Sequence, residues 1–444
     1  MKYKEYLKLA IPFTISTITQ PLLGAVDTAV IGRLGDPAYM GGVAVGTVIF
    51  STLYWLFGFL RVSTSGYSAQ ALGTNDEKDG LFALYRPSII AIIISFIFVA
   101  LQVPIFHTAM NLINPDIEVY RQASTYFHIL IWGAPFVLLN YVNLGWLMGR
   151  KKVKASMFLQ IFTNVLNIVL DIVFVMYFKM GVAGVAYATL IAQITAFAIG
   201  FYLISVNLNL SAIKKYLSQL FDQRAFKKIM GVNRDLMIRT VCLLIVTNMF
   251  VAKGASLGTE MLAANAVLFQ IQYIIAYFFD GFANASSVFV GTAVGEKNAK
   301  LYNEVLTVST KTTFILAAIM SLVIYFFRGE IISIFTVIEG IINLSLAYSM
   351  WLVIYPFVIG IGLVYYGIFT GATYTAPIRN SMILSLGVFL ITYFVMVPLW
   401  GNHGLWLSFI VFSLGRSVFL APYITTFKKE VFILETSQVI AHSV

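Results

Sequence analysis

The chain has 444 residues, of which 59% are hydrophobic and only 11% are charged, and its mean hydropathy is +0.87. Because an ordinary soluble protein carries about 25% charged residues, this composition excludes a soluble fold and indicates a protein that lies in a membrane. The formal net charge is +10, but a site for nucleic acid would need those charges concentrated on one basic face.

Twelve apolar stretches, each long enough to cross a bilayer, follow one another along the chain. A membrane-spanning helix needs about 20 residues that are mostly apolar. In chain order, the predicted spans are residues 7–33, 39–72, 80–106, 118–149, 153–178, 182–206, 225–253, 259–294, 301–327, 342–371, 378–400 and 403–427. The sequence therefore predicts an all-α polytopic membrane protein with twelve transmembrane helices.

Lys and Arg residues are distributed unevenly between the two sides of these spans. If the N-terminus is cytoplasmic, 20 of the 29 lie in inner segments, five in outer segments and four deeper in helices. The positive-inside rule then places both termini in the cytoplasm, as an even number of spans requires. We expect a multi-pass protein of the cell inner membrane, whose net charge reflects topology, and we expect no nucleic-acid partner.

Two sequence motifs recur in the second half of the chain at an offset of about 222 residues. RLGDPAYMGGVAV at residues 33–45 corresponds to ASLGTEMLAANAV at residues 255–267, and YSAQALG at residues 67–73 corresponds to FVGTAVG at residues 289–295. Six spans in each copy predict two parallel lobes related by a pseudo-two-fold axis along the membrane normal. The predicted domains are an N-lobe at residues 1–206, an amphipathic cytoplasmic linker helix at 207–224, a C-lobe at 225–427 and a cytoplasmic tail at 428–444. Two such lobes are typical of alternating-access carriers, although channels and receptors can also be duplicated.

Polar side chains recur at helical spacing inside several predicted spans. In the fifth span, Gln160, Asn164, Asn167 and Asp171 follow at steps of 4, 3 and 4, which places them on one face of the helix. Similar stripes in the first, fourth and sixth spans comprise Thr17, Gln20, Gly24 and Asp27, then Asn140 and Asn143, and finally Thr189 and Gln193. The Asn and Gln members either line a cavity or form interhelical hydrogen bonds, which contribute about 0.6 kcal/mol each.

Asp27 and Asp171 stand out in these stripes, because an aspartate near the middle of a membrane helix costs roughly 2.5 to 3.5 kcal/mol. Both lie about 10 Å inside the outer membrane surface, at the level of Thr189. We therefore expect Asp27, Asn167, Asp171 and Thr189 to meet in one pocket of the N-lobe. Two carboxylates in a poorly solvated pocket raise each other's proton affinity, so this pocket suits a proton. The same oxygens suit Na⁺, and two acids that are only hydrogen-bonded in a helix interface are the structural alternative.

The C-terminal half does not duplicate this acidic pocket, because the counterpart of Asp27 is Asn248 or Met249. Arg239 and Asp280 lie at similar depth in the seventh and eighth spans, and we expect them to pair. The pair would act as a structural or gating salt bridge, or it would take part in ion coupling.

Other residues inside the spans suggest a cavity and close helix packing. Arg61 and Arg416 are deep enough to line or close a cavity, or to extend to lipid headgroups. The expected cavity-lining residues are Gln20, Asn140, Asn143, Asn164, Gln193 and Arg61. The glycine pairs Gly42/Gly46 and Gly367/Gly371 predict close approach between helices.

Motifs for catalysis are nearly absent from the chain. GASLG at residues 254–258 matches a nucleophile elbow, but it lies at a loop between spans and lacks the strand–turn–helix setting that this motif requires. No Walker A sequence is present, so an ion gradient would have to drive any transport. We therefore expect neither an enzyme nor a cofactor.

The run AIPFTISTITQPLLGAVDTAVIGRLG at residues 10–35, together with the Asn167/Asp171 pair and the twelve spans in two halves, resembles the multidrug and toxic compound extrusion (MATE) transporters of the DinF-like branch. The resemblance covers essentially the whole chain. It implies that Asp27, Asn167, Asp171 and Thr189 form the cation or proton site of the N-lobe, and that span one bends at Pro12 on protonation. The chain departs from the NorM-like branch, whose coupling acids lie in the C-lobe, and Asp280 is the nearest equivalent.

These observations predict a secondary antiporter that exports amphipathic, often cationic compounds in exchange for protons, or for Na⁺. We expect amphipathic small molecules and membrane lipids as its partners, and a monomer as its assembly state. A lipid or lipid-linked oligosaccharide flippase of the same wider superfamily is one alternative. A membrane receptor or scaffold that transports nothing is the other, and its polar stripes would serve only to pack helices.

Overall fold

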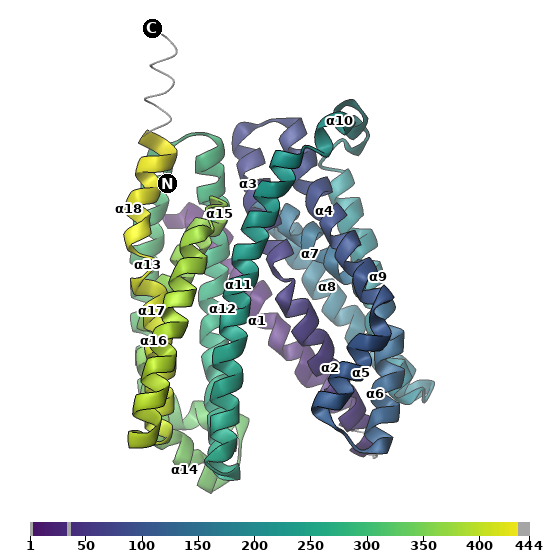
Figure 1. Ribbon diagram of the computed structural model, residues 1–444, viewed down its shortest axis with the longest axis vertical. Coiled ribbons are helices and arrows are strands. Elements are labelled where there is room, and N and C mark those ends of the chain that lie inside the picture. The colour runs from purple at the N-terminus through teal and green to yellow at the C-terminus, as the bar shows by residue number, and fades with distance from the viewer. Residues whose placement is uncertain (1–2, 33–36, 434–444) are drawn as a thin grey trace. The chain divides into compact units, whose positions relative to one another are not determined.

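The computed structural model describes the backbone of residues 3–32 and 37–433, and the side chains of these residues except 19–37 and 433. Every regular element in these ranges is helical (Figure 1). The first half comprises α1 (Tyr3–Gly32), α2 (Pro37–Leu56), α3 (Phe59–Thr74), α4 (Glu77–Ala100), α5 (Gln102–Ile113), α6 (Ile117–Leu130), η1 (Ile131–Gly133), α7 (Ala134–Gly149), α8 (Val153–Asp171), η2 (Ile172–Tyr177) and α9 (Gly181–Ser205). The rest comprises η3 (Leu210–Tyr216), α10 (Leu217–Leu220), α11 (Gln223–Ser256), α12 (Thr259–Gly295), α13 (Ala299–Phe335), α14 (Glu339–Tyr348), α15 (Met350–Gly371), α16 (Ala376–Trp400), α17 (Asn402–Val418), α18 (Pro422–Lys428) and η4 (Lys429–Ile433).

The helices confirm the predicted all-α membrane fold. Among the described residues, 11 helical segments are long and apolar enough to cross a membrane. Several of them join consecutive elements, as α2 and α3 do in the segment Ala38–Thr74. The 30-residue helix α1 covers residues 7–32 of the first predicted span, and residue 33 lies outside the described residues. With α1, the helices account for the twelve-span architecture.

The third predicted span, residues 80–106, is divided in the structure. Helix α4 ends at Ala100 and α5 begins at Gln102. Pro104 explains the division, because it has no N–H to donate to the carbonyl of Ala100, four residues earlier.

The tenth predicted span, residues 342–371, is also shorter than expected. Helix α14 ends at Tyr348, and the crossing helix α15 begins only at Met350. The hydroxyl of Ser349 donates to the carbonyl of Leu346 at 2.7 Å, which satisfies one of the carbonyls left over at the end of α14.

The chain forms two compact units. One comprises residues 18–230, and the other comprises residues 1–17 together with residues 231–444. The first 17 residues therefore pack with the second half of the chain, although the sequence assigned them to the N-lobe. The boundaries predicted at residues 206 and 224 stay predictions.

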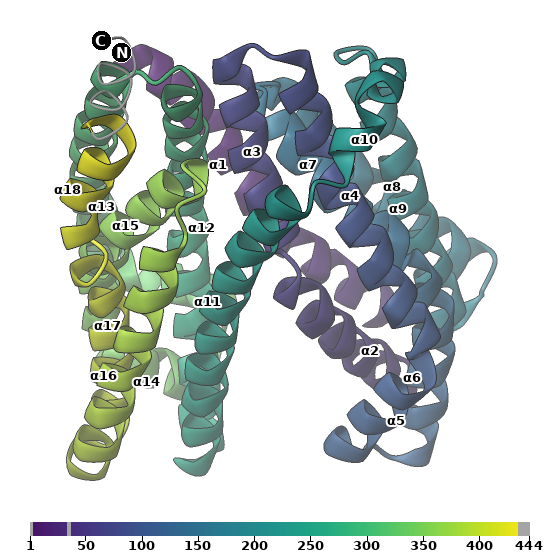
Figure 2. The ribbon, with the colours of Figure 1, turned by 45° about the horizontal axis from the view of Figure 1, so that its top comes forward.

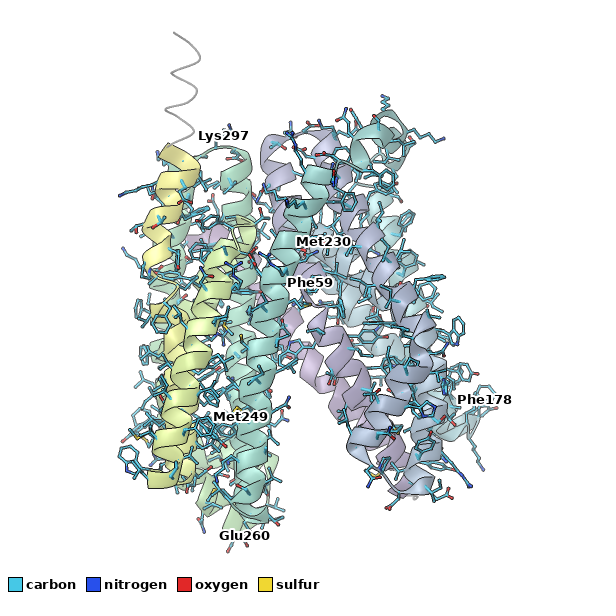
Figure 3. The ribbon with its side chains drawn as sticks, in the orientation of Figure 1. Phe59, Phe178, Met230, Met249, Glu260 and Lys297 are labelled. Atoms are coloured by element: carbon cyan, nitrogen blue, oxygen red, sulfur yellow. The ribbon has the colours of Figure 1, made fainter. Side chains whose placement is uncertain are left out.

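Helix α12 holds the first part of α1 inside the second unit. The hydroxyl of Thr17 donates to the carbonyl of Tyr277 at 2.9 Å. At Gly281, a Cβ atom would lie 2.5 Å from the Cα atom of Thr14, so the two helices touch through their backbones. Helix α12 extends from the end of the unit near Glu260 to the opposite end near Lys297 (Figure 3). The first part of α1 is thus anchored by its own hydroxyl groups and by a glycine of α12.

The linker is less regular than the continuous amphipathic helix that we expected. It consists of the 3₁₀ segment η3 and the four-residue helix α10. Asp222 then caps α11, because its carboxylate accepts hydrogen bonds from the backbone N–H groups of Arg224 and Ala225, both at 3.3 Å. Within the same unit, Arg86 of α4 donates to the carbonyl of Leu220 at 3.0 Å, which ties the linker to α4.

Glycines allow equivalent helix pairs to approach closely in both units. In the second unit, where α12 runs alongside α15 (Figures 1 and 2), a Cβ at Gly367 would lie 2.1 Å from the carbonyl oxygen of Ala283. In the first unit, a Cβ at Gly145 of α7 would lie 2.3 Å from the carbonyl oxygen of Arg61 on α3. The two contacts are related by the offset that relates the sequence motifs.

The predicted close packing at both glycine pairs is confirmed. A Cβ at Gly371 would lie 2.0 Å from the carbonyl oxygen of Ser287. A Cβ at Gly42 would lie 2.3 Å from the Cβ of Gln122, and one at Gly46 would lie 2.2 Å from the ring of Tyr126. These distances are too short for any side chain.

Replacing Gly371 by Ala is expected to destabilise the protein by about 1–3 kcal/mol, the usual cost of an overpacked core. The new methyl group would meet a backbone carbonyl, which cannot move away as a side chain can. A lowered melting temperature of the purified protein in detergent checks this. Gly387→Ala in α16 is the matched control, because nothing lies within 4 Å of a Cβ there. Equal melting temperatures for the two variants would contradict the expectation.

Candidate functional site in the N-terminal half

Helices α8 and α9 bring two of the predicted coupling residues together. The side-chain amide of Asn167 donates to the hydroxyl oxygen of Thr189 at 3.2 Å. Asn167 is 3% exposed and Asp171, one turn later on the same face of α8, is 0% exposed. A fully buried carboxylate at this position in a membrane protein marks a functional site by default.

Asp171 lies where the geometry of its helix changes. It is the last residue of α8, and the following residues Ile172–Tyr177 form the π-helix η2. Single-turn π segments inside helices are frequent at functional sites, because they alter the direction of the side chains on either side. The helix therefore changes its register directly after the carboxylate.

The side chains of Asp27 and Gln20 lie outside the described residues. The backbone of α1 is helical through both positions and through Pro12. The meeting of Asp27 with Asp171 and the bending of α1 at Pro12 therefore stay predictions.

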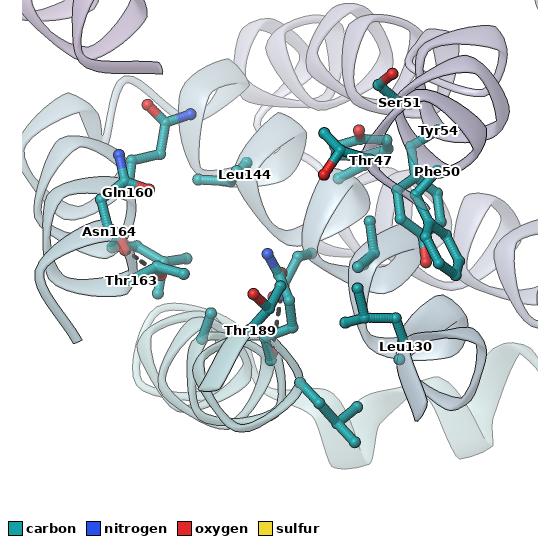
Figure 4. A pocket seen from close by; sticks show the side chains of 18 of the residues that line it. Thr47, Phe50, Ser51, Tyr54, Leu130, Leu144, Gln160, Thr163, Asn164 and Thr189 are labelled. Atoms are coloured by element: carbon teal, nitrogen blue, oxygen red, sulfur yellow. Dashed lines mark hydrogen bonds between the residues drawn. The ribbon is translucent and has the colours of Figure 1, made fainter. Parts of the chain in front are cut away.

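A cavity of about 300 Å³ lies next to the Asn167–Thr189 pair, within the unit of residues 18–230. In Figure 4, Thr47, Ser51 and Tyr54 of α2 face this cavity from one side. Gln160 and Asn164 of α8, and Thr189 of α9, line it as well. The full lining is Thr47, Phe50, Ser51, Tyr54, Tyr126, Leu130, Gly133, Val137, Asn140, Tyr141, Leu144, Leu159, Gln160, Thr163, Asn164, Thr189, Leu190, Gln193 and Ala196.

The lining combines hydroxyl groups, amides and aromatic rings, and none of these residues is charged. Such a surface offers dispersion and cation–π contacts to the body of an amphipathic molecule and hydrogen bonds to its polar atoms. Thr189 belongs both to this lining and to the hydrogen bond with Asn167. The cavity and the buried polar pair therefore share one side chain.

The structure places the predicted amides in two settings. Asn140 lines the cavity and donates to the backbone carbonyl and to the side-chain oxygen of Gln193, both at 3.0 Å. Asn164 also lines the cavity. Asn143 is not among the lining residues; it is 3% exposed and donates to the carbonyl of Phe197 at 3.5 Å. Asn143 therefore joins helices α7 and α9.

The hydroxyl groups of α2 are functional candidates that the sequence analysis missed. Thr47, Ser51 and Tyr54 follow at steps of 4 and 3, the same helical spacing that singled out the stripe in the fifth span. That spacing was a usable signal. Tyr126 and Tyr141 could not be recognised from the sequence, because tyrosines are common in membrane helices for other reasons.

The predicted pairing of Arg239 with Asp280 is not found. Among the described residues, the guanidinium of Arg239 lies within 4.0 Å of no carboxylate oxygen. It lies instead over the ring of Tyr366, 4.1 Å from the ring centre, where the aromatic face stabilises its charge. Asp280 accepts a hydrogen bond from the amide of Asn284 at 3.3 Å.

The structure also shows where Arg61 and Met249 lie, two further residues that the sequence singled out. Arg61 of α3 is partly exposed, and its carbonyl lies against Gly145. Met249, a candidate counterpart of Asp27, lies on α11 (Figure 3). In the part of the chain whose side chains are described, no three His, Cys, Asp or Glu residues gather to hold a metal ion.

A duplicated bundle of crossing helices, with a buried carboxylate beside an uncharged cavity, is the arrangement of a membrane transporter. The MatE family model matches residues 12–173 and matches again at residues 235–396. The chain therefore belongs to the MatE family. The two matches begin at positions that agree with the offset between the sequence motifs. The family model therefore corresponds to one copy of the internal repeat.

Relatives of known name agree with this assignment and with the DinF-like resemblance. The chain is 37% identical to DNA damage-inducible protein F of Escherichia coli (strain K12) over 420 residues, which cover 94% of this chain and 91% of that protein. It is 24% identical to the probable multidrug resistance protein NorM of Photorhabdus laumondii, over 80% of this chain and 78% of that one. These relatives indicate an efflux transporter in a membrane.

Solved structures show the same fold. The crystal structure of MATE in the bent conformation has a TM-score of 0.88, at 19% identity over 97% of this chain and 96% of that one. An outward-facing multidrug resistance MATE family transporter has a TM-score of 0.83, at 20% identity over 99% and 96% of the two chains. At this identity, the similarity shows the architecture alone.

Proposed function

We propose that this protein is a secondary antiporter of the inner membrane, with both termini cytoplasmic, that exports amphipathic compounds in exchange for protons. It works as a monomer among membrane lipids, without a cofactor and without catalysis. The observation that carries this proposal is the double role of Thr189, which lines the cavity and accepts the hydrogen bond of buried Asn167. A molecule in the cavity and a proton at Asp171 would then act on the same contact between α8 and α9.

The coupling follows from the cost of a buried charge. When Asp171 is ionised, its charge must be stabilised by neighbouring dipoles, and the amide of Asn167 and the hydroxyl of Thr189 are held ready for that purpose. When the carboxyl takes up a proton from outside, that demand disappears and the α8–α9 contact can rearrange around the cavity. Proton and substrate then weaken each other's binding, as reciprocal linkage requires. Asp27 would share the proton with Asp171 as a coupled pair.

Thr189→Val tests the shared contact, because valine keeps the shape of threonine and removes the acceptor for Asn167. A buried donor left without a partner costs about 1–3 kcal/mol, so we expect proton-driven efflux to fall by about tenfold or more. Efflux of a fluorescent amphipathic cation from proteoliposomes with an imposed pH gradient measures this.

Thr195→Val is the matched control, since Thr195 lies on the same helix, is partly exposed, does not line the cavity and donates only to the carbonyl of Ile191 among the described residues. We expect it to transport at the wild-type rate. Equal efflux by Thr189→Val and Thr195→Val would contradict the proposal. Repeating the assay with a Na⁺ gradient and no pH gradient tests whether Na⁺ replaces the proton at Asp27, Asn167, Asp171 and Thr189.

A further inference from the structure

Two arginines lie close together inside the unit that contains the C-terminal half. Arg239 belongs to α11 and Arg416 to α17, and both lie against neighbouring turns of α15. Arg239 lies over the ring of Tyr366, and a Cβ at Gly362, one turn earlier, would lie 3.5 Å from the carbonyl carbon of Arg416. Their positive charges repel each other. Arg416 is only 9% exposed. Within the described ranges, neither guanidinium lies within 4.0 Å of a carboxylate oxygen. Two like charges without an acid are an unusual feature in the interior of a membrane protein, because each is costly to bury and each raises the cost of the other.

Aromatic rings offset only part of that cost. Arg239 lies 4.1 Å from the ring centre of Tyr366, and Arg416 lies 5.9 Å from that of Phe412. A cation–π contact offsets less than the penalty of burying a guanidinium. The N–H groups of the two arginines therefore keep the capacity to bind an anion.

A third hydrogen-bond donor, a tyrosine hydroxyl, lies beside the two arginines. Tyr355 of α15 is 2% exposed, and its ring stacks on that of Phe409, on the same helix as Arg416, with ring centres 5.9 Å apart. Its hydroxyl also interacts electrostatically with Arg416. Its oxygen accepts a hydrogen bond from the side-chain amide of Gln272. Because that bond occupies the oxygen as an acceptor, the hydroxyl proton of Tyr355 remains to be donated.

The helix that carries Arg416 is held firmly. The hydroxyl of Ser417, the next residue, donates to the carbonyl of Val358 on α15 at 2.7 Å. At the start of α17, Asn402 and Asn265 exchange two buried hydrogen bonds at 2.8 and 3.0 Å. Hydrogen bonds near both ends of α17 thus fix the position of Arg416, so its charge lies at a defined place in the bundle.

We propose that Arg239, Arg416 and Tyr355 bind the oxyanion of an amphipathic molecule, a carboxylate, sulfonate or phosphate on an apolar body. The inference rests on the proposed transport function and adds anionic or zwitterionic amphiphiles to its substrates. A guanidinium presents parallel N–H groups that match the two oxygens of such an anion, and the phenol supplies a further hydrogen bond. The uncharged cavity of the other unit offers no cationic group that would bind an anion. Arg239 and Arg416 would therefore determine whether an anionic amphiphile is accepted.

Binding of two matched probes tests the proposal. The full-length protein is placed in nanodiscs of phosphatidylcholine and titrated with 11-(dansylamino)undecanoate, or with the same dansyl chain that ends in trimethylammonium. Hydrogen bonds between charged groups are stronger than those between neutral groups, so Arg416→Gln and Arg239→Gln should each weaken binding of the carboxylate about tenfold or more. Binding of the ammonium probe should not weaken.

Arg328→Gln is the control, because Arg328 lies in the same unit, 5.5 Å from the ring centre of Tyr325, and faces no carboxylate within 4.0 Å among the described residues. It should leave both probes unaffected. Carboxylate binding that is unchanged in Arg416→Gln would overturn the proposal. If that variant does not fold, Tyr355→Phe removes the hydroxyl and keeps the ring, and unchanged carboxylate binding there would overturn the proposal equally.

Two further arms separate the possible outcomes. Phosphatidylglycerol in the nanodiscs will compete with the carboxylate probe in the wild type if a lipid phosphate occupies the site, which supports the site and assigns its anion to lipid. Absence of competition supports a transported amphiphile. If proteoliposomes move no probe of either charge under a proton gradient, the transport proposal fails, and the effect of Arg416→Gln on binding still decides whether the anion site exists.

Discussion

Asp171→Asn is expected to abolish proton-driven efflux while the protein still folds and binds its substrate with the lower affinity of the protonated state. Asparagine has nearly the same shape and keeps the hydrogen-bonding capacity of the site, but it cannot gain or lose a proton. In the wild type, acid on the outer side should weaken substrate binding, because protonation and binding oppose each other. In Asp171→Asn that pH dependence should disappear. Efflux from proteoliposomes under a pH gradient, together with substrate titrations at several pH values, measures both effects.

Asp116→Asn is the control for this substitution, because Asp116 is an exposed carboxylate directly before α6. It should transport and bind as the wild type does. Asp27→Asn should show the same loss as Asp171→Asn, since the two acids are expected to share one site. Efflux at the wild-type rate by Asp171→Asn would remove the basis of the proposed coupling.

Filling the cavity of the N-terminal half is expected to produce the second large loss. Asn164→Trp would place an indole in a space of about 300 Å³, where Asn164 is part of the lining and partly exposed. Bulky amphipathic compounds should then neither bind nor be exported, while the melting temperature changes little because the new side chain enters existing space. Equilibrium binding of a fluorescent substrate and efflux in proteoliposomes measure the loss.

Phe158→Trp provides the comparison for the larger side chain. Phe158 lies on the same helix, is exposed and does not line the cavity. We expect normal binding and normal efflux from this variant. If Asn164→Trp also exports the substrate normally, the compound passes elsewhere and the cavity is not its binding site.

The sequence pattern predicted the helices and the direction of their polar faces well, because both depend on local periodicity. The stripe in the fifth span placed Gln160, Asn164 and Asn167 on the side of α8 that faces the cavity and Thr189. The glycine pairs likewise marked close contacts, since a small residue inside an apolar helix has few other purposes. The predicted helix boundaries were wrong near Pro104 and Ser349, where a helix ends inside an apolar run.

Contacts between distant helices could not be predicted in the same way. Arg239 and Asp280 have similar depth, but depth does not determine which way each helix is turned, and Arg239 faces Tyr366 instead. The approach of Arg416 to Arg239 depends on how α11 and α17 pack, and no pattern within either helix records it. The hydroxyl groups of α2 were overlooked for a different reason, since their spacing was visible but no acid drew attention to them.

The packing of the first seventeen residues against α12 has a consequence for the history of this chain. A protein that arose by duplication begins as two copies that can each fold alone. Here the second half is completed by residues from the opposite end of the polypeptide, whose hydroxyl groups and glycine contact fill a face of α12. A gene cut between the repeats would therefore yield a second product with a missing piece. The two copies can therefore no longer be separated without loss, because the fold of the second copy depends on residues that belong to the first.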